Sequence, residues 1–272
     1  MAVSKDPQKA TAGNPLSAVA RVAAVGVVGG AIMAAMAVPV VAGFGKASDV
    51  AAEQIGALPA ELATPPLPNR TYMLDADGNR IATLFDENRI EVPLSQISEN
   101  MQRAIVAVED ERFYEHNGVD VQGLIRAQLE NTASGSIRQG ASTLTMQYVK
   151  NVLVTAAADE DQVEAAVEQT TARKLQEIRY AVQVERELTK DEILNRYLNI
   201  AYFGSGAYGV EAASRRYFGH SANKLTPAEA ATLAGIVQSP VGYDPLINPE
   251  ESETRRNAVL TKMESLDYIT PE

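Results

Sequence analysis

The chain contains no cysteine and only two histidines, His116 and His220. Without cysteine there can be no disulfide framework, no thiol nucleophile and no zinc site with cysteine ligands. Two histidines are too few for a multi-histidine metal centre. Basic residues are scarce as well, because 24 Lys and Arg stand against 35 Asp and Glu and leave a net charge of −11. This balance argues against a protein that works mainly by coating nucleic acid.

One long segment carries no charge at all: residues 22–45 read VAAVGVVGGAIMAAMAVPVVAGFG. A helix of this length would measure about 36 Å, enough to cross a hydrocarbon core of about 30 Å. Basic residues precede the segment, so we predict a transmembrane helix with residues 1–21 in the cytoplasm and the rest of the chain outside. A cleaved signal peptide is the alternative, because Val40-Val41-Ala42 resembles a cleavage site, although the apolar run is longer than is usual for a signal.

The segment that follows the apolar run changes in composition twice. Residues 46–70 contain four prolines among small and acidic residues, which predicts a juxtamembrane stalk. Two alternating runs then flank Asp77-Gly78 and predict a β-hairpin. Residues 89–94 predict a third short extended run.

From about Ser95 the apolar residues recur at helical spacing. We predict helices over five segments, 97–108, 175–182, 191–199, 227–237 and 252–266. The predicted fold class is therefore mainly α with a small N-terminal β element. Residues 71–272 are expected to form one extracytoplasmic domain.

Two patterns are interpreted as structural only. Residues 152–172 hold five acidic residues and no basic one, which is typical of a solvated insertion. Residues 204–209 match GxGxxG literally, but the dinucleotide fingerprint follows a strand, and residues 193–199 are predicted to be helical. We expect these glycines to form a tight link between two packed helices.

Two glutamates are predicted to lie in opposite environments. Glu109 continues the apolar stripe of its helix four positions after Ile105, so its carboxylate is expected to be partly desolvated and able to exchange a proton near neutrality. Glu177 follows Arg173 and Lys174 by four and three positions, which favours its ionised form. Such a pair is a recurring acid–base arrangement. Taken alone, either residue could instead be a satisfied buried Glu or a surface ion pair.

A polar segment, residues 139–147, concentrates hydroxyl and amide side chains between a glycine and Lys150. Many hydrogen-bonding groups in one segment suit the binding of a sugar or a phosphate. The segment lacks the Gly-Lys-Ser/Thr ending of a P-loop. A polar loop without function is the alternative.

Six short segments follow one another along the chain: EDERFYEHNG at 109–118, GASTLTMQYVKN at 140–151, RKLQE at 173–177, KDEILNRYLN at 190–199, YFGSGAYG at 202–209 and LAGIVQSPVGYDP at 233–245. In this order they resemble the motifs of the peptidoglycan glycosyltransferases, the family 51 transglycosylases. That family includes the N-terminal module of class A penicillin-binding proteins and monofunctional transglycosylases. The sequence departs from the family pattern at Ala141, Met146 and Asn195, which replace a Gly, a Gln and a Glu. Gln147 and Lys150 remain, so we expect activity to persist.

The resemblance implies a lysozyme-like glycosyltransferase domain with head and jaw subdomains. It implies polymerisation of lipid II into β-1,4 glycan strands by an inverting displacement that releases polyprenyl diphosphate. Glu109 would be the general base on the acceptor hydroxyl. Glu177 would assist departure of the diphosphate, directly or through a divalent ion such as Mg²⁺ or Mn²⁺. The residues expected to bind substrate are Asp110, Phe113, His116, Ser142, Thr143, Gln147, Lys150, Asn151, Arg173 and Lys174.

The partners implied by the resemblance are lipid II, the nascent glycan strand and the bilayer, with cell-wall synthesis or division proteins as further candidates and no organic cofactor. Two alternatives stay open: an inactive scaffold module of the same fold, and a lytic enzyme that cleaves glycan. Both glutamates and the three basic residues Lys150, Arg173 and Lys174 are present, which disfavours the first alternative. A lytic enzyme has no need of cations that bind diphosphate, which disfavours the second. No Lys-Thr-Gly occurs, which excludes a penicillin-binding site from these residues. We expect the chain to be a fragment of a bifunctional protein rather than a monofunctional enzyme.

Overall fold

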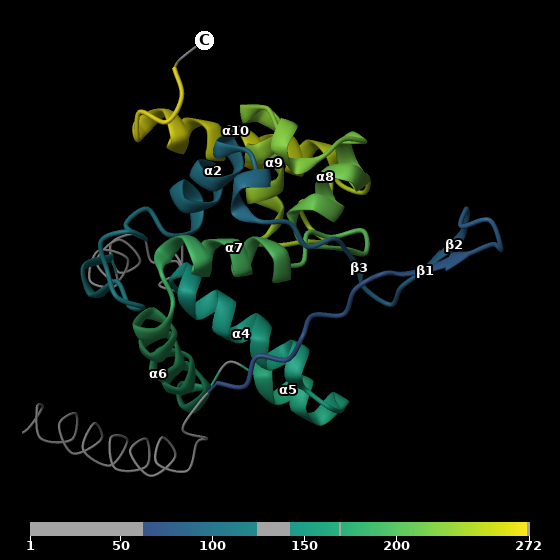
Figure 1. Ribbon diagram of the computed structural model, residues 1–272. Coiled ribbons are helices and arrows are strands. Elements are labelled where there is room, and N and C mark those ends of the chain that lie inside the picture. Colours follow the sequence, from purple (N-terminus) through teal and green to yellow (C-terminus); the bar gives the residue numbers. More distant parts are fainter. Residues whose placement is uncertain (1–61, 124–141, 169, 271–272) are drawn as a thin grey trace, which may run out of the picture. The chain divides into compact units, whose positions relative to one another are not determined.

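The computed structural model describes residues 62–123, 142–168 and 170–270 (Figure 1). Over these residues the chain is mainly helical with a few short strands, as predicted. The predicted transmembrane helix at 22–45 and the N-terminal segment 1–21 lie outside the described residues, as does most of the predicted stalk. None of the helices in the described part of the chain combines the length and the apolar character that a membrane crossing requires.

The predicted hairpin is present. Strand β1 (Thr71–Leu74) pairs antiparallel with strand β2 (Arg80–Leu84). The carboxylate of Asp75 orders the turn, because it accepts hydrogen bonds from the backbone N–H groups of Asp77 and Asn79 at 3.0 and 2.7 Å. This is an Asx-turn of Asp75, and Gly78 of the predictive Asp77-Gly78 pair supplies the positive φ that the turn needs.

The extended run predicted at 89–94 is a strand only at its start. Strand β3 (Asn88–Arg89) pairs in parallel with strand β4 (Ala207–Tyr208), and a 3₁₀ helix, η1 (Leu94–Gln96), follows. Between them the backbone of Val92 is bonded to a side chain instead of a strand. Its N–H donates to Asn199 Oδ1 at 3.0 Å, and its carbonyl accepts from Asn199 Nδ2 at 2.9 Å. The predicted extended run is therefore paired with another strand only at Arg89, because the Asn199 amide satisfies the groups of Val92 that a neighbouring strand would have bonded.

The helices form two packed groups. The longer elements are α2 (Glu99–Glu109), α4 (Leu144–Ala156), α5 (Glu160–Val167), α6 (Thr171–Glu187), α7 (Lys190–Ile200), α8 (Val210–Phe218), α9 (Pro227–Ile236) and α10 (Pro249–Ser265). Helices α2, α9 and α10 pack on one another, while α4 packs on α6 and α7. Helix α7 also packs on η1 and α8, so the two groups share one hydrophobic core.

Side-chain caps determine where most of these helices begin. A hydroxyl accepts a hydrogen bond from a backbone N–H in the first turn of each, and this satisfies a donor that has no partner within the helix. The capping residues are Ser98 for α2, Thr143 for α4, Thr170 for α6, Thr189 for α7 and Thr226 for α9. The cap explains why α2 begins after Ile97, which is buried but lies outside the helix.

Both structural-only interpretations are confirmed. Helix α5 has no buried residue, so the acidic part of the predicted insertion is solvated, whereas its first residues belong to α4 and bury Val152. The glycine-rich link joins helix α7 to helix α8 through β4, and Gly204, Gly206 and Gly209 all have positive φ. A Cβ atom at Gly209 would lie only 2.7 Å from the Asn199 carbonyl oxygen, so the close packing there requires glycine.

Candidate active site

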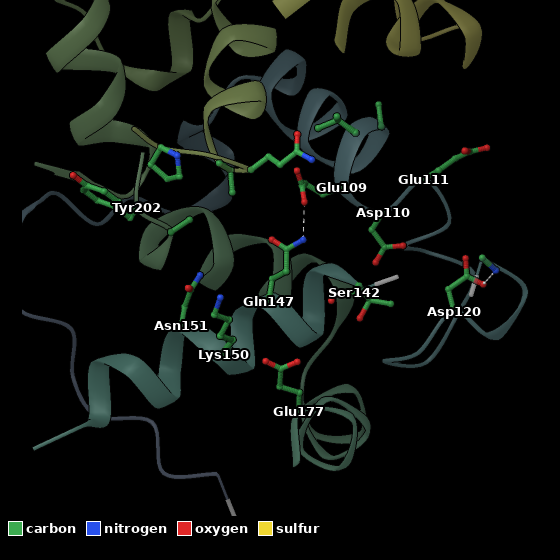
Figure 2. A pocket seen from close by; sticks show the side chains of 18 of the residues that line it. Glu109, Asp110, Glu111, Asp120, Ser142, Gln147, Lys150, Asn151, Glu177 and Tyr202 are labelled. Atoms are coloured by element: carbon green, nitrogen blue, oxygen red, sulfur yellow. Dashed lines mark hydrogen bonds between the residues drawn. The ribbon is translucent and has the colours of Figure 1, made fainter. Parts of the chain in front are cut away.

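A cavity of about 800 Å³ opens between the two helix groups (Figure 2). Its size lies within the range of small-molecule sites. Ten of the twelve predicted site residues line it: Glu109, Asp110, Ser142, Thr143, Gln147, Lys150, Asn151, Arg173, Lys174 and Glu177. The structure therefore brings together motifs that lie far apart in the sequence, including the two glutamates whose proximity spacing alone could not establish.

Glu109 is the last residue of helix α2 and opens onto the cavity. Burial raises the pKa of its carboxyl, as predicted from its place on the apolar stripe. A hydrogen bond from Gln147 Nε2 to Glu109 Oε2, 2.7 Å long, opposes this shift, and so does the positive charge of Arg255 (Figure 2). Glu109 is therefore a carboxyl group of raised pKa that still has donors to stabilise its ionised form.

Glu177 lies on the other side of the cavity and is buried with two cations of its own helix (Figure 2). One carboxylate oxygen is paired with Arg173, and the other lies 3.2 Å from Lys174 Nζ. Lys174 also donates to the Ser142 hydroxyl at 2.5 Å. The spacing of four and three residues thus does place both cations on the Glu177 carboxylate, as predicted from the sequence.

The cations outnumber the carboxylate in this part of the cavity. Burial, together with the positive charges of Arg173 and Lys150, lowers the pKa of Lys174 to about 8. Burial and the charge of Arg173 also lower the pKa of Lys150. These shifts show that the cations repel one another, so an anion entering the cavity would relieve the repulsion. We refer to Lys150, Arg173 and Lys174 as the cation cluster.

Asp110 lines the cavity and joins the first two motifs (Figure 2). Its carboxylate lies 2.9 Å from His116 Nε2 and accepts the backbone N–H of Leu144, the first residue of α4, at 3.0 Å. His116 itself does not line the cavity, and neither does Phe113, which is fully buried with Lys190 Nζ 4.5 Å from its ring centre. These last two residues do not reach the cavity, and their substrate contacts stay a prediction.

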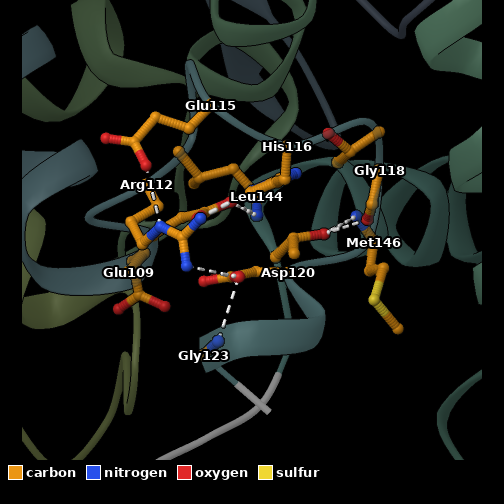
Figure 3. A network of polar contacts seen from close by, with 12 residues as sticks. Glu109, Arg112, Glu115, His116, Gly118, Asp120, Gly123, Leu144 and Met146 are labelled. Atoms are coloured by element: carbon orange, nitrogen blue, oxygen red, sulfur yellow. Dashed lines mark hydrogen bonds and ion pairs between the residues drawn. The ribbon is translucent and has the colours of Figure 1, made fainter. Parts of the chain in front are cut away.

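Thr143 likewise uses its side chain within the protein. Its hydroxyl donates to the Gly118 carbonyl at 2.7 Å and accepts the N–H of Met146 at 3.2 Å (Figure 3). Arg112 contacts Asp120 at 3.3 Å, and Asp120 accepts the N–H of Gly123. These bonds hold the segment after Glu109 against the start of α4, so the wall of the cavity is built from the first two motifs together.

A family model described as Transglycosylase matches residues 77–264. The chain belongs to the transglycosylase family. It is similar to penicillin-binding protein 1F of Bacillus subtilis (strain 168), with 37% identity over 198 residues, covering 73% of this chain and 26% of that protein. It is also similar to penicillin-binding protein 1A of Escherichia coli (strain K12), with 41% identity over 206 residues, covering 76% of this chain and 23% of that protein. The transglycosylase chain thus spans about a quarter of the length of these curated relatives.

Among solved structures, the chain resembles penicillin-binding protein 1A from Haemophilus influenzae, with 24% identity, a TM-score of 0.39 and coverage of 77% of this chain and 20% of that one. Every residue that lines the cavity falls within the range matched by the transglycosylase family.

Two of the three departures from the family pattern lie away from the cavity of this transglycosylase. The side chain of Met146 is buried in the core, whereas the neighbouring Gln147 reaches the cavity. Asn195 donates to the Val92 carbonyl at 3.0 Å and does not line the cavity. The third departure, Ala141, lies outside the described residues.

One wall of the transglycosylase cavity was missed from the sequence. Helix α10 contributes Arg255, Ala258 and Lys262, and further lining residues outside the predicted set include Ala201, Tyr202, Val237, Gln238 and Pro240. The three α10 residues are spaced i, i+3 and i+7 and therefore share one helical face, but two cations on a polar helix resemble any solvated surface. The Arg255 guanidinium lies 5.8 Å from the Tyr243 ring centre, and its Nε atom is buried without a hydrogen-bond partner among the described residues.

The expected divalent cation would need side chains in the cavity that could serve as its ligands. Within the part of the chain that the structure describes, no group of three or more His, Asp or Glu side chains lies close enough to hold a metal ion. Both carboxylate oxygens of Glu177 already face cations. The described side chains therefore do not form a metal site by themselves, and an ion held mainly by the diphosphate oxygens of the substrate stays a prediction.

Proposed function

We propose that this transglycosylase domain polymerises lipid II into β-1,4-linked glycan strands by an inverting displacement, with release of polyprenyl diphosphate. The observation that carries the proposal is the cavity that holds a carboxyl group of raised pKa, Glu109, together with the cation cluster around Glu177. One side of the cavity can accept a proton and the other can bind a diphosphate. A lysozyme-like arrangement with head and jaw subdomains is part of the same proposal.

On the acceptor side, Glu109 acts as the general base. Its carboxylate removes the proton from the 4-hydroxyl of the acceptor sugar while the hydroxyl oxygen forms a bond to the anomeric carbon of the donor. Burial strengthens the carboxylate as a base because it raises the pKa towards neutrality. The hydrogen bond from Gln147 keeps the ionised form populated.

On the donor side, the bond between the anomeric carbon and the diphosphate oxygen breaks, and negative charge grows on the leaving group. The cation cluster is positioned to neutralise that charge before the reaction begins, which is the effective form of electrostatic catalysis. Lys174 has a pKa of about 8 and is mainly protonated at neutral pH. Glu177 orients Arg173 and Lys174 by pairing with both.

We infer that residues 22–45 anchor the protein in the cell membrane, with residues 1–21 in the cytoplasm and the domain outside. The proposed substrate carries a polyprenyl tail that stays in the bilayer, so an anchored enzyme meets it at the membrane surface. The nascent glycan strand is the proposed second ligand, and cell-wall synthesis or division proteins are candidate partners.

The test is polymerisation of labelled lipid II by the full chain and by the Glu109→Gln and Glu177→Gln variants. We expect glycan strands from the unchanged protein and at least a 100-fold loss in each variant, because one loses the base and the other the carboxylate that orients the cation cluster. Glu187→Gln, at the exposed end of the same helix as Glu177, is the matched control and should retain full activity.

Full activity of Glu109→Gln would contradict the mechanism. An unchanged protein that binds lipid II without elongating it would favour the inactive scaffold module instead. Shortening of preformed glycan strands would favour a lytic enzyme.

A further inference from the structure

Three side chains from three helices form a hydrogen-bonded chain that ends on Glu109. The hydroxyl of Tyr197 in α7 donates to Gln147 Oε1 at 2.9 Å, and Gln147 Nε2 in α4 donates to Glu109 Oε2 at 2.7 Å. Tyr197 has no exposed surface and does not line the cavity. The substrate can therefore reach Glu109 but not the tyrosine at the other end of the chain.

The orientation of the Gln147 amide determines whether Glu109 faces a hydrogen-bond donor or an acceptor. With nitrogen towards Glu109, the amide donates to the carboxylate and favours its ionised form. With the amide reversed, its oxygen would face the carboxylate, and two acceptors would repel each other unless Glu109 were protonated. The amide orientation and the protonation state of Glu109 are thus coupled.

A buried hydroxyl hydrogen needs an acceptor, because an unsatisfied donor in the core is costly. Gln147 Oε1 supplies that acceptor to Tyr197 only while the amide nitrogen faces Glu109. In the reversed orientation the tyrosine would face an NH₂ group, and its own hydrogen would be left without this partner. Burial raises the pKa of Tyr197 well above its usual value, so the hydroxyl keeps its proton throughout the working pH range.

We propose that Tyr197 is a positioning residue that holds the Gln147 amide in the orientation that keeps Glu109 ionised. The inference rests on the proposed role of Glu109 as the base. It assigns to Gln147 the support of the base rather than contact with substrate alone, and it gives Tyr197 a role that its position in a helical motif does not reveal.

The other charged groups around Glu109 lie on separate elements. Arg255 on α10 lowers the pKa of Glu109, and Asp110 on the following segment raises it. Across the cavity stand the cation cluster and Glu177. Removal of the Tyr197 hydroxyl changes none of these charges, so a change in the titration of Glu109 would report on the amide.

The experiment compares the unchanged protein with Tyr197→Phe, which removes one hydroxyl and keeps the ring. The pKa of Glu109 is measured from the pH dependence of its carboxyl carbon resonance, assigned with Glu109→Gln. We expect the pKa of Glu109 to rise in Tyr197→Phe. We also expect kcat for lipid II polymerisation to fall roughly 10- to 100-fold with little change in KM, and the acidic limb of the rate profile to move to higher pH.

Tyr148→Phe is the matched control, because Tyr148 is also buried and stands next to Gln147 in the same helix. It should leave the pKa of Glu109 and the rate profile unchanged. Gln147→Leu removes the middle member of the hydrogen-bonded chain and should raise the pKa of Glu109 as well. In the Gln147→Leu background, Tyr197→Phe should then have no further effect on that pKa, since the link between them is already broken.

An unchanged pKa of Glu109 in Tyr197→Phe, or additive effects of the two substitutions, would overturn the inference. If the unchanged protein does not polymerise lipid II, the proposed function fails. The pKa measurement still decides the inference in that case, because it requires no turnover. If Tyr197→Phe does not fold, the absence of a pKa change in Gln147→Leu would overturn it in the same way.

Discussion

The side chains that line the cavity are of two kinds, and the two kinds respond to substitution in different ways. The carboxyl of Glu109 and the cation cluster are open to a ligand in the cavity. The side chains of Asp110 and Thr143 instead form hydrogen bonds with backbone groups of the protein. Substitutions of the first kind should change the chemistry, and those of the second kind should first change stability.

Asp110→Asn tests a residue of the wall. The neutral amide keeps the shape but weakens the charge-assisted hydrogen bonds to the Leu144 N–H and to His116. We expect the free energy of unfolding to fall by about 1.5–3 kcal/mol, measured by urea denaturation. Asp161→Asn, on the exposed helix α5, is the control and should change it by less than about 0.5 kcal/mol. Equal effects of the two substitutions would show that Asp110 has no such role.

Lys174 gives a prediction for the alkaline side of the pH profile. Its pKa of about 8 means that Lys174 loses its proton as the pH rises through that value. The neutral amine no longer attracts the negative charge of diphosphate. We expect kcat/KM for lipid II to fall above about pH 8. Lys174→Arg should shift this limb to higher pH, because a guanidinium stays protonated there.

Lys224→Arg, an exposed lysine far from the cavity lining, is the control for this substitution and should leave the limb in place. If the alkaline limb does not move in Lys174→Arg, the limb arises from the titration of another group.

Whole elements were predicted well where local signals agree with one another. The helices combine apolar spacing with hydroxyl caps, and both signals lie within a few residues. The pairing of β3 with β4 could not be predicted, because two-residue strands carry almost no pattern and their partners are more than a hundred residues apart. The bonding of Val92 to Asn199 could not be predicted either, because a distant side-chain amide produces no pattern in the sequence of the segment that it bonds.

The link between α7 and α8 provides a test at this scale. Gly209→Ala would place a Cβ atom 2.7 Å from the Asn199 carbonyl oxygen at a residue with φ of 77°. Gly206→Ala has a similar φ of 75° but meets nothing within 4 Å. We expect Gly206→Ala to lower the free energy of unfolding by about 1 kcal/mol and Gly209→Ala by at least about 2–3 kcal/mol. Thermal denaturation of both variants measures the difference, and equal losses would refute a role for close packing.

At the scale of the whole domain, the motifs predicted most of the cavity and the spacing of residues predicted the environment of its charges. The raised pKa of Glu109 and the two cations on Glu177 both follow from positions along single helices. The sequence could not show which helices meet, and so the contribution of α10 to the cavity and the bond between Tyr197 and Gln147 were missed. Their contributions arise from which face of a helix meets which neighbour, and that is decided by packing over the entire core.

Asp110 follows the proposed base directly, and Leu144, whose N–H it accepts, begins the helix that carries Gln147. The distance between Glu109 and its amide partner is therefore set by two segments jointly and by neither one alone. An exchange of one segment for that of a distant relative should be tolerated only when the other accompanies it. The two segments would thus be inherited as a unit.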